Sequence, residues 1–421
     1  MNNKIKKILM INEYSMFENN PLGITLRNIF KVWPDTKIFE VFRYSTAELE
    51  DGRIKIKSYK LPSNSLPIDY IIRRILHKEI KEPQLTSFQI PSNEKISFKH
   101  QIIMSAKYIT ESLFVFRRNS EIDQELARFN PEVIYTNGES LFSLKVCLHF
   151  SRLLNIPIVI HYMDNWRETL YPKTGLLKIF HYLFSRNLRL VEDRMKNGLV
   201  ISPKMKLEYS LQNSKVKYSV LLNPVPGPFQ RKNCQPANKE IIFSYIGGLH
   251  LSRWESLLEV ERCICELNQA GMPSKLYIYT PQVYSTEFAD KYNHQFTIFK
   301  GYLPPDEVNN ALQDADILVH VEAFNSQVTK YTQYSLSTKI PEYMAAGKPI
   351  LCYAPRFLSV SEYIENTKSG ISTDTYKDLL QAAVCLSTDI NLRAELGNNG
   401  LSTVINAHSP QRALETLMDS L

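Results

Sequence analysis

Short apolar runs recur along the chain, each followed by turn residues and a longer helical pattern, and they constrain the fold more than any other feature. Runs of this kind, bounded by polar, Gly or Pro residues, are typical of strands in a parallel sheet that is buried on both faces. They form two series, at 7–12, 133–136, 158–161 and 198–202 and then at 241–246, 275–279, 296–300, 317–321 and 349–353. The sequence therefore predicts an α/β chain with two sets of βα units.

A proline-rich segment separates the two series. In Asn223-Pro-Val-Pro-Gly-Pro-Phe229 the closely spaced prolines exclude a helix or a central strand, and a polar stretch follows. A chain of 421 residues also exceeds what one hydrophobic core usually supports. We predict a first domain at 1–224, a second domain at 225–405, and a last helix at 406–421 that returns to the first domain.

Composition limits the class of protein. The net charge of +7 is spread along the chain, which favours anionic ligands or lipid surfaces over nucleic acid. The six cysteines have no paired spacing and do not form a disulfide framework, as expected for a reducing, cytoplasmic setting. No apolar run has the length that a membrane span needs, and no signal-peptide cleavage site follows the basic start. We expect a cytoplasmic protein.

The segment from Tyr334 to Leu351 reads as loop, helix and strand in quick succession. Ser337 or Thr338 can cap the helix, and Pro341 is tolerated in its first turn because the missing N–H would have no helical partner there. Gly347 is expected to end the helix before the strand.

The start of this helix is a predicted anion site. Its free N–H groups and positive dipole end attract an anion, and Lys339 adds charge. The hydroxyls of Ser335, Ser337 and Thr338 add hydrogen-bond donors, so a diphosphate fits this environment. Glu342, in the first turn, either accepts hydrogen bonds from the ribose diol of a nucleotide or complements the helix dipole, and the spacing leaves both open.

Residues 337–350, Ser-Thr-Lys-Ile-Pro-Glu-Tyr-Met-Ala-Ala-Gly-Lys-Pro-Ile, resemble the donor-site segment of family 4 glycosyltransferases, the glycosyl transferases group 1. In that family the second glutamate of an E-x7-E motif binds ribose, and Glu342 matches it. The first glutamate, which contacts the donor sugar, falls at Tyr334, so the chain departs from the common pattern. It is similar instead to a branch with a Ser-Thr-Lys or Pro-Ser-Lys version.

A second match is Tyr245-Ile-Gly-Gly-Leu-His-Leu-Ser-Arg-Trp254, which follows a predicted strand and is similar to the diphosphate-binding loop of the family. The resemblance implies that Gly247 and Gly248 lie against the donor and that Arg253 replaces the usual lysine. Gly248 occupies the position of the usual arginine, so Arg253 has to supply the charge. The alternative for Arg253 is a solvated surface arginine.

In the first domain the resemblance points to three residues. Gly23 is expected to face the donor diphosphate, and a simple turn glycine is the alternative. His161 ends a predicted strand and Asp164 follows it, at the sheet edge where open α/β sheets bind ligands. By resemblance His161 lies near the donor sugar and acts in catalysis, with Asp164 close by; the alternative for His161 is a structural histidine.

The resemblance implies the GT-B fold, in which two Rossmann-like domains have parallel sheets that face each other across a cleft. It implies transfer of a sugar from a UDP- or GDP-sugar with retention, with Arg253, Lys339 and His161 as catalytic residues. The acceptor would be a saccharide or a lipid-linked saccharide in capsule, exopolysaccharide or lipopolysaccharide synthesis. The nucleotide-sugar is a co-substrate, no other cofactor is expected, and no metal is expected because cations and a helix end stabilise the leaving diphosphate.

Two other functions stay open at this level. Tyr334 and Gly248 replace expected functional residues, as in a degenerate subunit that binds nucleotide and supports an active partner. A nucleotide-sugar epimerase would use the same fold without a separate acceptor.

Residues 64–126 are expected to form a helical insertion in the first domain. Its cations either lie on an anionic membrane surface or form a solvated face; they are Arg73, Arg74, Lys78, Arg117 and Arg118.

Overall fold

The chain divides into two compact units. The computed structural model describes residues 5–18, 20–45, 56–61, 108–109, 112, 120–175, 177–227, 240–304 and 306–421. One unit contains Met1–Asn223 and Pro410–Leu421, and the other contains Pro224–Ser409. Most of the expected insertion, with all five of its basic residues, and the polar stretch at 228–239 lie outside the described residues.

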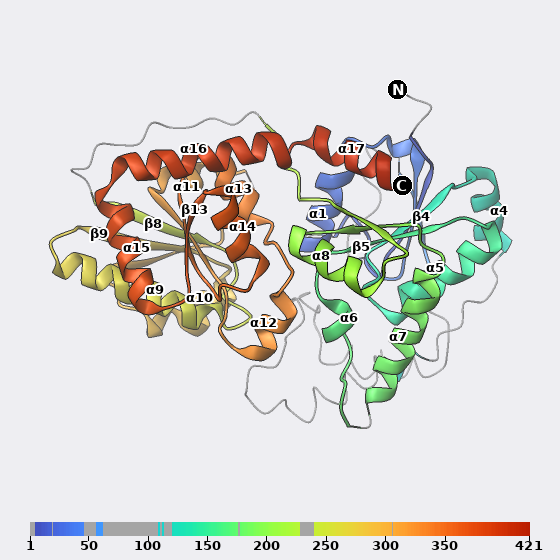
Figure 1. Cartoon of the computed structure of the whole chain (residues 1–421), viewed down its shortest axis with the longest axis horizontal. Helices are drawn as coiled ribbons and strands as arrows, with labels where there is room; N and C mark the ends of the chain where they lie inside the picture. Colours follow the sequence, from blue (N-terminus) through green and yellow to red (C-terminus); the bar gives the residue numbers. More distant parts are fainter. Residues whose placement is uncertain are drawn as a thin grey trace. The chain divides into compact units, whose positions relative to one another are not determined.

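The first unit is built on a seven-stranded parallel sheet with the order β3-β2-β1-β4-β5-β6-β7. Helices lie on both faces of the sheet (Figure 1). The strands are β1 (Ile8–Ile11), β2 (Ile38–Phe42), β3 (Lys57–Lys60), β4 (Val133–Thr136), β5 (Ile158–Tyr162), β6 (Asn197–Val200) and β7 (Lys217–Val220). The helices are α1 (Pro21–Phe30), α4 (Ser120–Phe129), α5 (Leu141–Leu154), α6 (Trp166–Thr169), α7 (Lys178–Glu192), α8 (Pro203–Gln212) and α17 (Pro410–Ser420), with a short 3-10 helix, η2 (Asp35–Lys37).

The second unit has a six-stranded parallel sheet with the order β10-β9-β8-β11-β12-β13. Its strands are β8 (Ile241–Ile246), β9 (Ser274–Tyr279), β10 (Thr297–Gly301), β11 (Ile317–Val321), β12 (Ile350–Tyr353) and β13 (Gly370–Thr373). Its helices are α9 (Arg253–Gln269), α10 (Gln282–Phe288), η3 (Ala289–Lys291), α11 (Val308–Asp314), α12 (Ser326–Thr332), α13 (Lys339–Ala345), α14 (Ser359–Thr367), α15 (Tyr376–Thr388) and α16 (Ile390–Ala407). The two parallel sheets confirm the predicted fold class.

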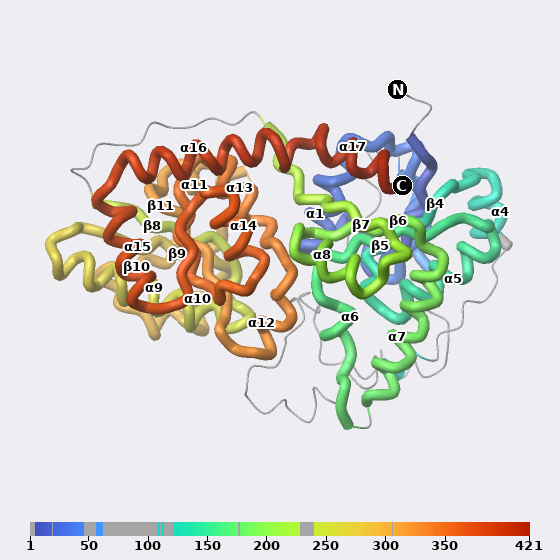
Figure 2. The backbone as a smooth tube through the Cα atoms, in the orientation of Figure 1, coloured from blue at the N-terminus to red at the C-terminus, as the bar shows by residue number. Residues whose placement is uncertain are grey.

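The last helix, α17, packs in the first unit, beside α1, although α16 before it belongs to the second unit (Figures 1 and 2). Ala413, Leu417 and Leu421 are buried in the core of the first unit. The side-chain amide of Asn197 also donates a hydrogen bond to the Ser420 carbonyl, at 2.9 Å. The last helix begins at Pro410, four residues later than the predicted start at 406, because α16 continues to Ala407.

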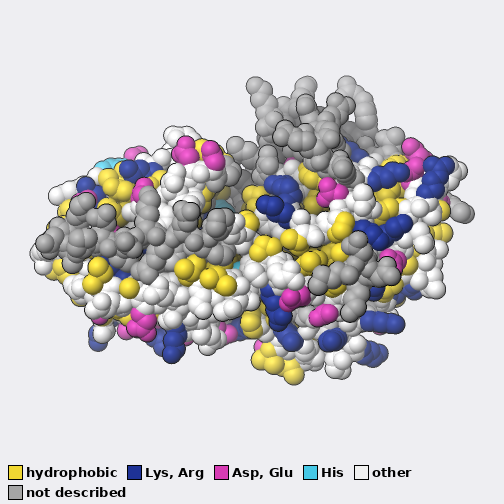
Figure 3. All heavy atoms as spheres, turned by 90° about the horizontal axis from the view of Figure 1, so that it is seen from above, with side chains coloured by type: hydrophobic (Ala, Val, Ile, Leu, Met, Phe, Trp, Pro, Cys, Tyr) yellow, Lys and Arg dark blue, Asp and Glu magenta, His cyan; other side chains and the backbone are white. Residues whose placement is uncertain are grey.

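Charge on the surface is mixed. On the face shown in Figure 3, Lys and Arg side chains lie among acidic and hydrophobic ones. No helix within the described ranges is both long enough and apolar enough to cross a bilayer.

Candidate functional site

The predicted phosphate-binding residues gather at one edge of the second sheet. β8 and β11 are neighbouring parallel strands, so the segments that follow them, starting at Gly247 and Glu322, leave the same edge. Open α/β sheets bind ligands at this edge, outside the carboxyl ends of the strands. The starts of α9, at Arg253, and α13, at Lys339, lie in the same place, as the contacts below show.

Lys339 lies directly over the Gly247 loop. A Cβ atom on Gly247 would sit 1.6 Å from the Lys339 Nζ, and the backbone φ of Gly247 is +154°. The ammonium is also 5.5 Å from the centre of the Tyr245 ring. The backbone conformation at residue 247 favours glycine, and a larger residue there would displace the Lys339 ammonium. The fold thus places the lysine of the Ser-Thr-Lys segment on the glycine loop, as a shared phosphate site requires.

Arg253 is not a solvated arginine. Its Nε and Nη2 donate to the carboxylate of Glu322, at 3.2 Å and 2.9 Å, which is a bidentate pair. The side chains are only 13% and 5% exposed. Arginine and carboxylate geometry match in such pairs, and the position of the guanidinium is therefore fixed.

The turn before Arg253 is strained. Leu251 and Ser252 have φ values of +58° and +54°, in the left-handed region that non-glycine residues rarely adopt. Ser256, one turn into α9, donates from its hydroxyl to the Glu322 carbonyl at 2.7 Å. The start of α9 is thereby tied to the end of β11 by both the side chain and the backbone of Glu322.

Burial and neighbouring cations make the charged forms of Lys339 and His250 costly. Burial and the neighbouring Arg253 lower the pKa of Lys339 to about 7. Burial, Arg253 and Lys339 lower the pKa of His250 to about 3. Burial alone would raise the pKa of Glu322, but Arg253 and His320 outweigh it and lower that pKa to about 2. A site in which basic groups are pushed toward their neutral forms is one that an incoming anion stabilises.

The α13 helix begins as the sequence predicts, with one difference. Thr338 occupies the capping position, but its backbone is helical and its side chain makes no capping hydrogen bond. Ser337 instead accepts a hydrogen bond on its hydroxyl from the Lys339 N–H, at 3.4 Å. Gly347 ends the helix with φ +66°, as predicted.

Glu342 is partly buried in the first turn of α13, and burial raises the pKa of its carboxyl while Lys339 opposes the rise. Ser335 is also partly exposed near the start of the helix, whereas Tyr334 is buried.

Gly248 accepts a hydrogen bond on its carbonyl from the Tyr245 hydroxyl, at 2.7 Å. A Cβ on Gly248 would lie 2.5 Å from the His250 ring. An arginine at residue 248 therefore has no room beside His250 in this arrangement.

Two of the three candidates in the first unit are tightly packed. Gly23 lies in the first turn of α1, and a Cβ there would meet the Glu18 carbonyl at 2.2 Å. Glycine is required at residue 23 because a larger side chain would collide with the backbone of the preceding loop. His161 is fully buried, and its Nδ1 is 2.8 Å from the Tyr135 hydroxyl. Burial lowers the His161 pKa to about 3, so the ring is neutral and has the surroundings of a structural histidine. Asp164 is partly exposed after β5.

The sequence did not single out Glu322, His320 or His250. A carboxylate directly after the buried run 317–321 was the available signal for Glu322, because a charge at the end of a buried strand needs a partner. His320 lies inside β11, with its Nε2 3.2 Å from Glu322. No group of three or more His, Cys, Asp or Glu side chains that could hold a metal occurs among the described residues.

Gly247→Ala provides a test of the lysine position. The added Cβ must displace Lys339, and the backbone conformation is strained, so we expect a loss of about 1–2 kcal/mol in unfolding free energy together with weaker diphosphate binding. Gly271→Ala is the matched control, because Gly271 has φ +77° but open space around its Cβ position. Urea unfolding and UDP titration of both variants give the comparison. Equal UDP affinity in the two variants would contradict the proposed place of Lys339.

Comparison with known proteins agrees with this geometry. Residues 261–419 match the family model described as glycosyl transferase-like. No curated protein sequence matches the chain. Similar solved structures include Anabaena Alr3699/HepE in complex with UDP-glucose, with 14% identity, TM-score 0.60 and coverage of 98% of this chain and 100% of that one. Sucrose-phosphate synthase from Thermosynechococcus elongatus has 14% identity and TM-score 0.61, over 97% and 96% of the chains. TarM from S. aureus, as the G117R mutant, has 14% identity and TM-score 0.58, over 98% and 99%.

The chain has the GT-B fold, which these structures share over nearly their whole length. Its second unit carries a glycosyl transferase-like domain. The fold and the match of residues 261–419 agree with the predicted class of protein, a GT-B glycosyltransferase.

Proposed function

We propose that the chain transfers a sugar from a UDP- or GDP-sugar to a saccharide acceptor, with UDP-sugars as the first donors to test. The observation that carries the proposal is the placement of Lys339 over Gly247, beside the fixed guanidinium of Arg253, where burial and Arg253 lower the pKa of the lysine. HepE, with the same fold, was crystallised with UDP-glucose, which supports the choice of UDP.

In this proposal the diphosphate lies between the Gly247 loop and the start of α13. Negative charge develops on the diphosphate as the glycosidic bond to the donor breaks, so cations already in place stabilise the transition state more than the ground state. Lys339 and Arg253 supply that charge together with N–H groups of α13. Glu342 accepts hydrogen bonds from the ribose diol, and no metal takes part. The resemblance to family 4 supports retention of the anomeric configuration.

We assign the residues of the first unit a supporting role. His161 is buried against Tyr135 and would hold the end of β5 in place. Asp164, partly exposed just after that strand, is the better candidate for contact with a sugar or acceptor. The acceptor we propose is a lipid-linked saccharide of capsule, exopolysaccharide or lipopolysaccharide synthesis, in the cytoplasm. WaaG, which has the same fold at 10% identity, is a glycosyltransferase involved in lipopolysaccharide biosynthesis, which supports this context.

The donor is identified by thermal stabilisation with UDP, GDP, ADP and their sugars. We expect one nucleotide to raise Tm by several degrees in the wild type and Glu342→Ala to lose about tenfold in affinity for it, because a carboxylate that binds two hydroxyls contributes about 1–3 kcal/mol. Glu362→Ala is the matched control, since Glu362 occupies the same position in the first turn of α14. No shift with any nucleotide would contradict the donor site. Nucleotide binding without donor turnover on any acceptor would favour a degenerate subunit.

A further inference from the structure

His250 is the only titratable side chain in the segment 247–252, which joins β8 to α9. Its carbonyl accepts a hydrogen bond from the Arg253 N–H at 3.4 Å. Arg253 and Lys339 both lower the pKa of its ring, so both cations lie close to the imidazole. The reaction proposed above leaves this side chain without a role.

The imidazole ring is held against Gly248 and Tyr284. A Cβ atom on Gly248 would lie 2.5 Å from the His250 Nδ1 and 3.2 Å from the Tyr284 ring, so the two rings occupy the space that a side chain at residue 248 would need. The Tyr284 hydroxyl is 3.2 Å from Nδ1, and the ring centres are 5.9 Å apart. Tyr284 belongs to α10, which follows β9, and β9 pairs with β8. Both rings therefore lie at the sheet edge from which the Gly247 loop leaves.

The second nitrogen of the His250 ring is available to a ligand. Nε2 has no hydrogen-bond partner among the described residues, and it is not fully buried. Burial raises the pKa of Tyr284, so the phenol keeps its hydrogen and can donate it to Nδ1. In that arrangement the ring hydrogen is on Nε2, which makes Nε2 a hydrogen-bond donor.

The surroundings of this donor select an anion. Arg253 and Lys339 repel a cation, and burial together with these two cations lowers the His250 pKa to about 3, so the ring is neutral near pH 7. A neutral N–H beside two cations avoids the repulsion of a third charge, and it needs no proton uptake when an anion binds. Phosphate oxygens accept strong, charge-assisted hydrogen bonds from such donors.

We propose that the His250 Nε2–H donates a hydrogen bond to the diphosphate of the nucleotide-sugar, as a third group beside Lys339 and Arg253, and that Tyr284 is a positioning residue that holds the ring in the required tautomer. This role rests on the donor site proposed above. When the bond between the sugar and the diphosphate breaks, its electron pair stays on the diphosphate oxygen. The added negative charge strengthens the hydrogen bond from His250, which keeps its proton throughout.

His250→Phe tests the role directly, because phenylalanine keeps a ring and removes both nitrogens. We expect at least a tenfold loss in affinity for UDP and for inorganic pyrophosphate, a probe that lacks the base and the sugar, as for the loss of a hydrogen bond to a charged group. His250→Gln, whose amide N–H can reach the position of Nε2, should stay within about threefold of the wild type. Tyr284→Phe should lose about threefold to fivefold, since only the orientation of the ring is affected. Calorimetric titration measures the affinities.

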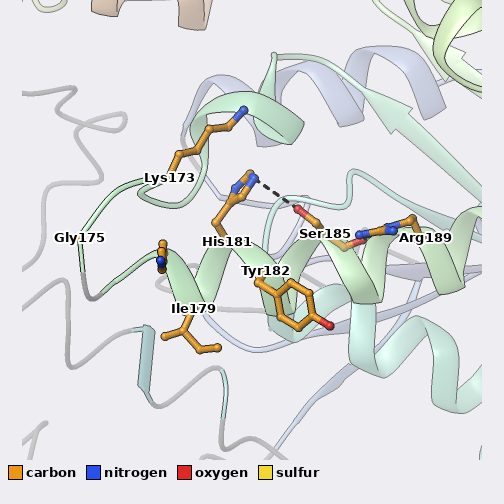
Figure 4. Close-up of a pocket in the computed structure, with 8 residues that line it drawn as sticks. Lys173, Gly175, Ile179, His181, Tyr182, Ser185 and Arg189 are labelled. Atoms are coloured by element: carbon orange, nitrogen blue, oxygen red, sulfur yellow. Dashed lines mark hydrogen bonds between the residues drawn. The ribbon is translucent and has the colours of Figure 1, made fainter.

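His181 provides the matched control histidine. It lies in a surface pocket at the start of α7, in the first unit, and it is partly exposed, as His250 is. Its side chain points toward Ser185, whose hydroxyl is 3.5 Å from the His181 Nε2 (Figure 4). His181→Phe removes the same two nitrogens from a histidine of the other unit and should bind UDP like the wild type.

Nitrogen NMR of the histidine rings uses the wild-type protein, so it does not depend on the folding of a variant. We expect the His250 Nε2 signal, assigned by its absence in His250→Gln, to shift when UDP binds and to remain that of a protonated nitrogen in a neutral ring. Unchanged His250 signals at saturating UDP would overturn the proposal, and so would a ring that gains a second proton.

The binding data also contain results that contradict the role of His250. Wild-type affinity in His250→Phe, an equal loss in His250→Gln, or an equal loss in His181→Phe would each do so. If Lys339→Met loses UDP while His250→Phe binds it normally, the donor site stands and only the role of His250 is wrong. If the wild type binds neither UDP, GDP nor pyrophosphate, the donor site itself is wrong and this role is wrong with it.

Discussion

Lys339→Met is expected to abolish donor binding and to raise the stability of the free protein. The lysine has to be charged to hold a diphosphate, but burial and Arg253 make the charged form costly in the absence of an anion. Methionine is unbranched and nearly as long as lysine, and it removes the cost of the buried charge. We therefore expect a gain of about 1 kcal/mol in unfolding free energy, with a loss of at least 100-fold in UDP-sugar affinity. Calorimetric titration and urea unfolding measure the two effects. A lysine with only a structural role would show the opposite, lower stability and unchanged binding.

The same lysine makes donor binding depend on pH. Lys339 has a pKa of about 7 in the free protein, and a bound diphosphate raises that pKa. Below pH 7 the ammonium is already present, whereas above pH 7 each binding event takes up a proton, so affinity should fall by up to about tenfold per pH unit. UDP-glucose is the suitable ligand because its diphosphate does not titrate in this range. Lys339→Met is the control, and an equal pH dependence in that variant would assign the titration to another group.

Free-protein stability has the opposite dependence on pH. The folded pKa of Lys339 lies below the unfolded value of 10.5, so the unfolded state binds more protons between about pH 7 and pH 10. The contribution of Lys339 to stability therefore rises with pH across this window. The loss of stability caused by the buried charge of Lys339 is present in full below pH 7.

Arg253→Met is expected to destabilise the second unit severely, and the double variant Arg253→Met/Glu322→Gln should recover most of the loss. Removal of the arginine leaves the Glu322 carboxylate buried without its bidentate partner, which costs about 3–5 kcal/mol. The second substitution removes that orphaned charge. Urea unfolding of both single variants and the double variant gives the coupling energy of the pair.

Function should not recover with stability in this cycle. If Arg253 contacts the donor diphosphate, the stable double variant still lacks the guanidinium and should lose at least 100-fold in kcat/KM, or about 2.7 kcal/mol of transition-state stabilisation. Normal UDP-sugar binding and turnover by the double variant would show that Arg253 is a structural residue. The double variant is the informative one, since Arg253→Met alone cannot separate unfolding from lost catalysis.

The sequence predicted most of the sheet because most strands are continuous apolar runs. Every run predicted as a strand overlaps one, and four strands were missed: β2, β3, β7 and β13. β2 has Glu40 inside an apolar stretch, and this carboxyl is fully buried, where burial raises its pKa to about 7 and the Met16 N–H donates to it. β3 and β7 are partly exposed and mix polar with apolar residues, and β13 begins with glycine. Their pairing is decided by neighbours in space, which local patterns do not record.

The sequence by itself determined the repeated βα pattern, the interdomain segment and the helix that begins at the Ser-Thr-Lys segment, because strand burial, proline and helix ends act over a few neighbouring residues. Tertiary structure alone decided that Gly247 lies under Lys339, that Arg253 is bound by Glu322, and that His161 is buried against Tyr135. These contacts join residues 92, 69 and 26 positions apart, and the pKa values at the site follow from them. Charge, burial and steric fit between distant segments exist only once the chain has folded.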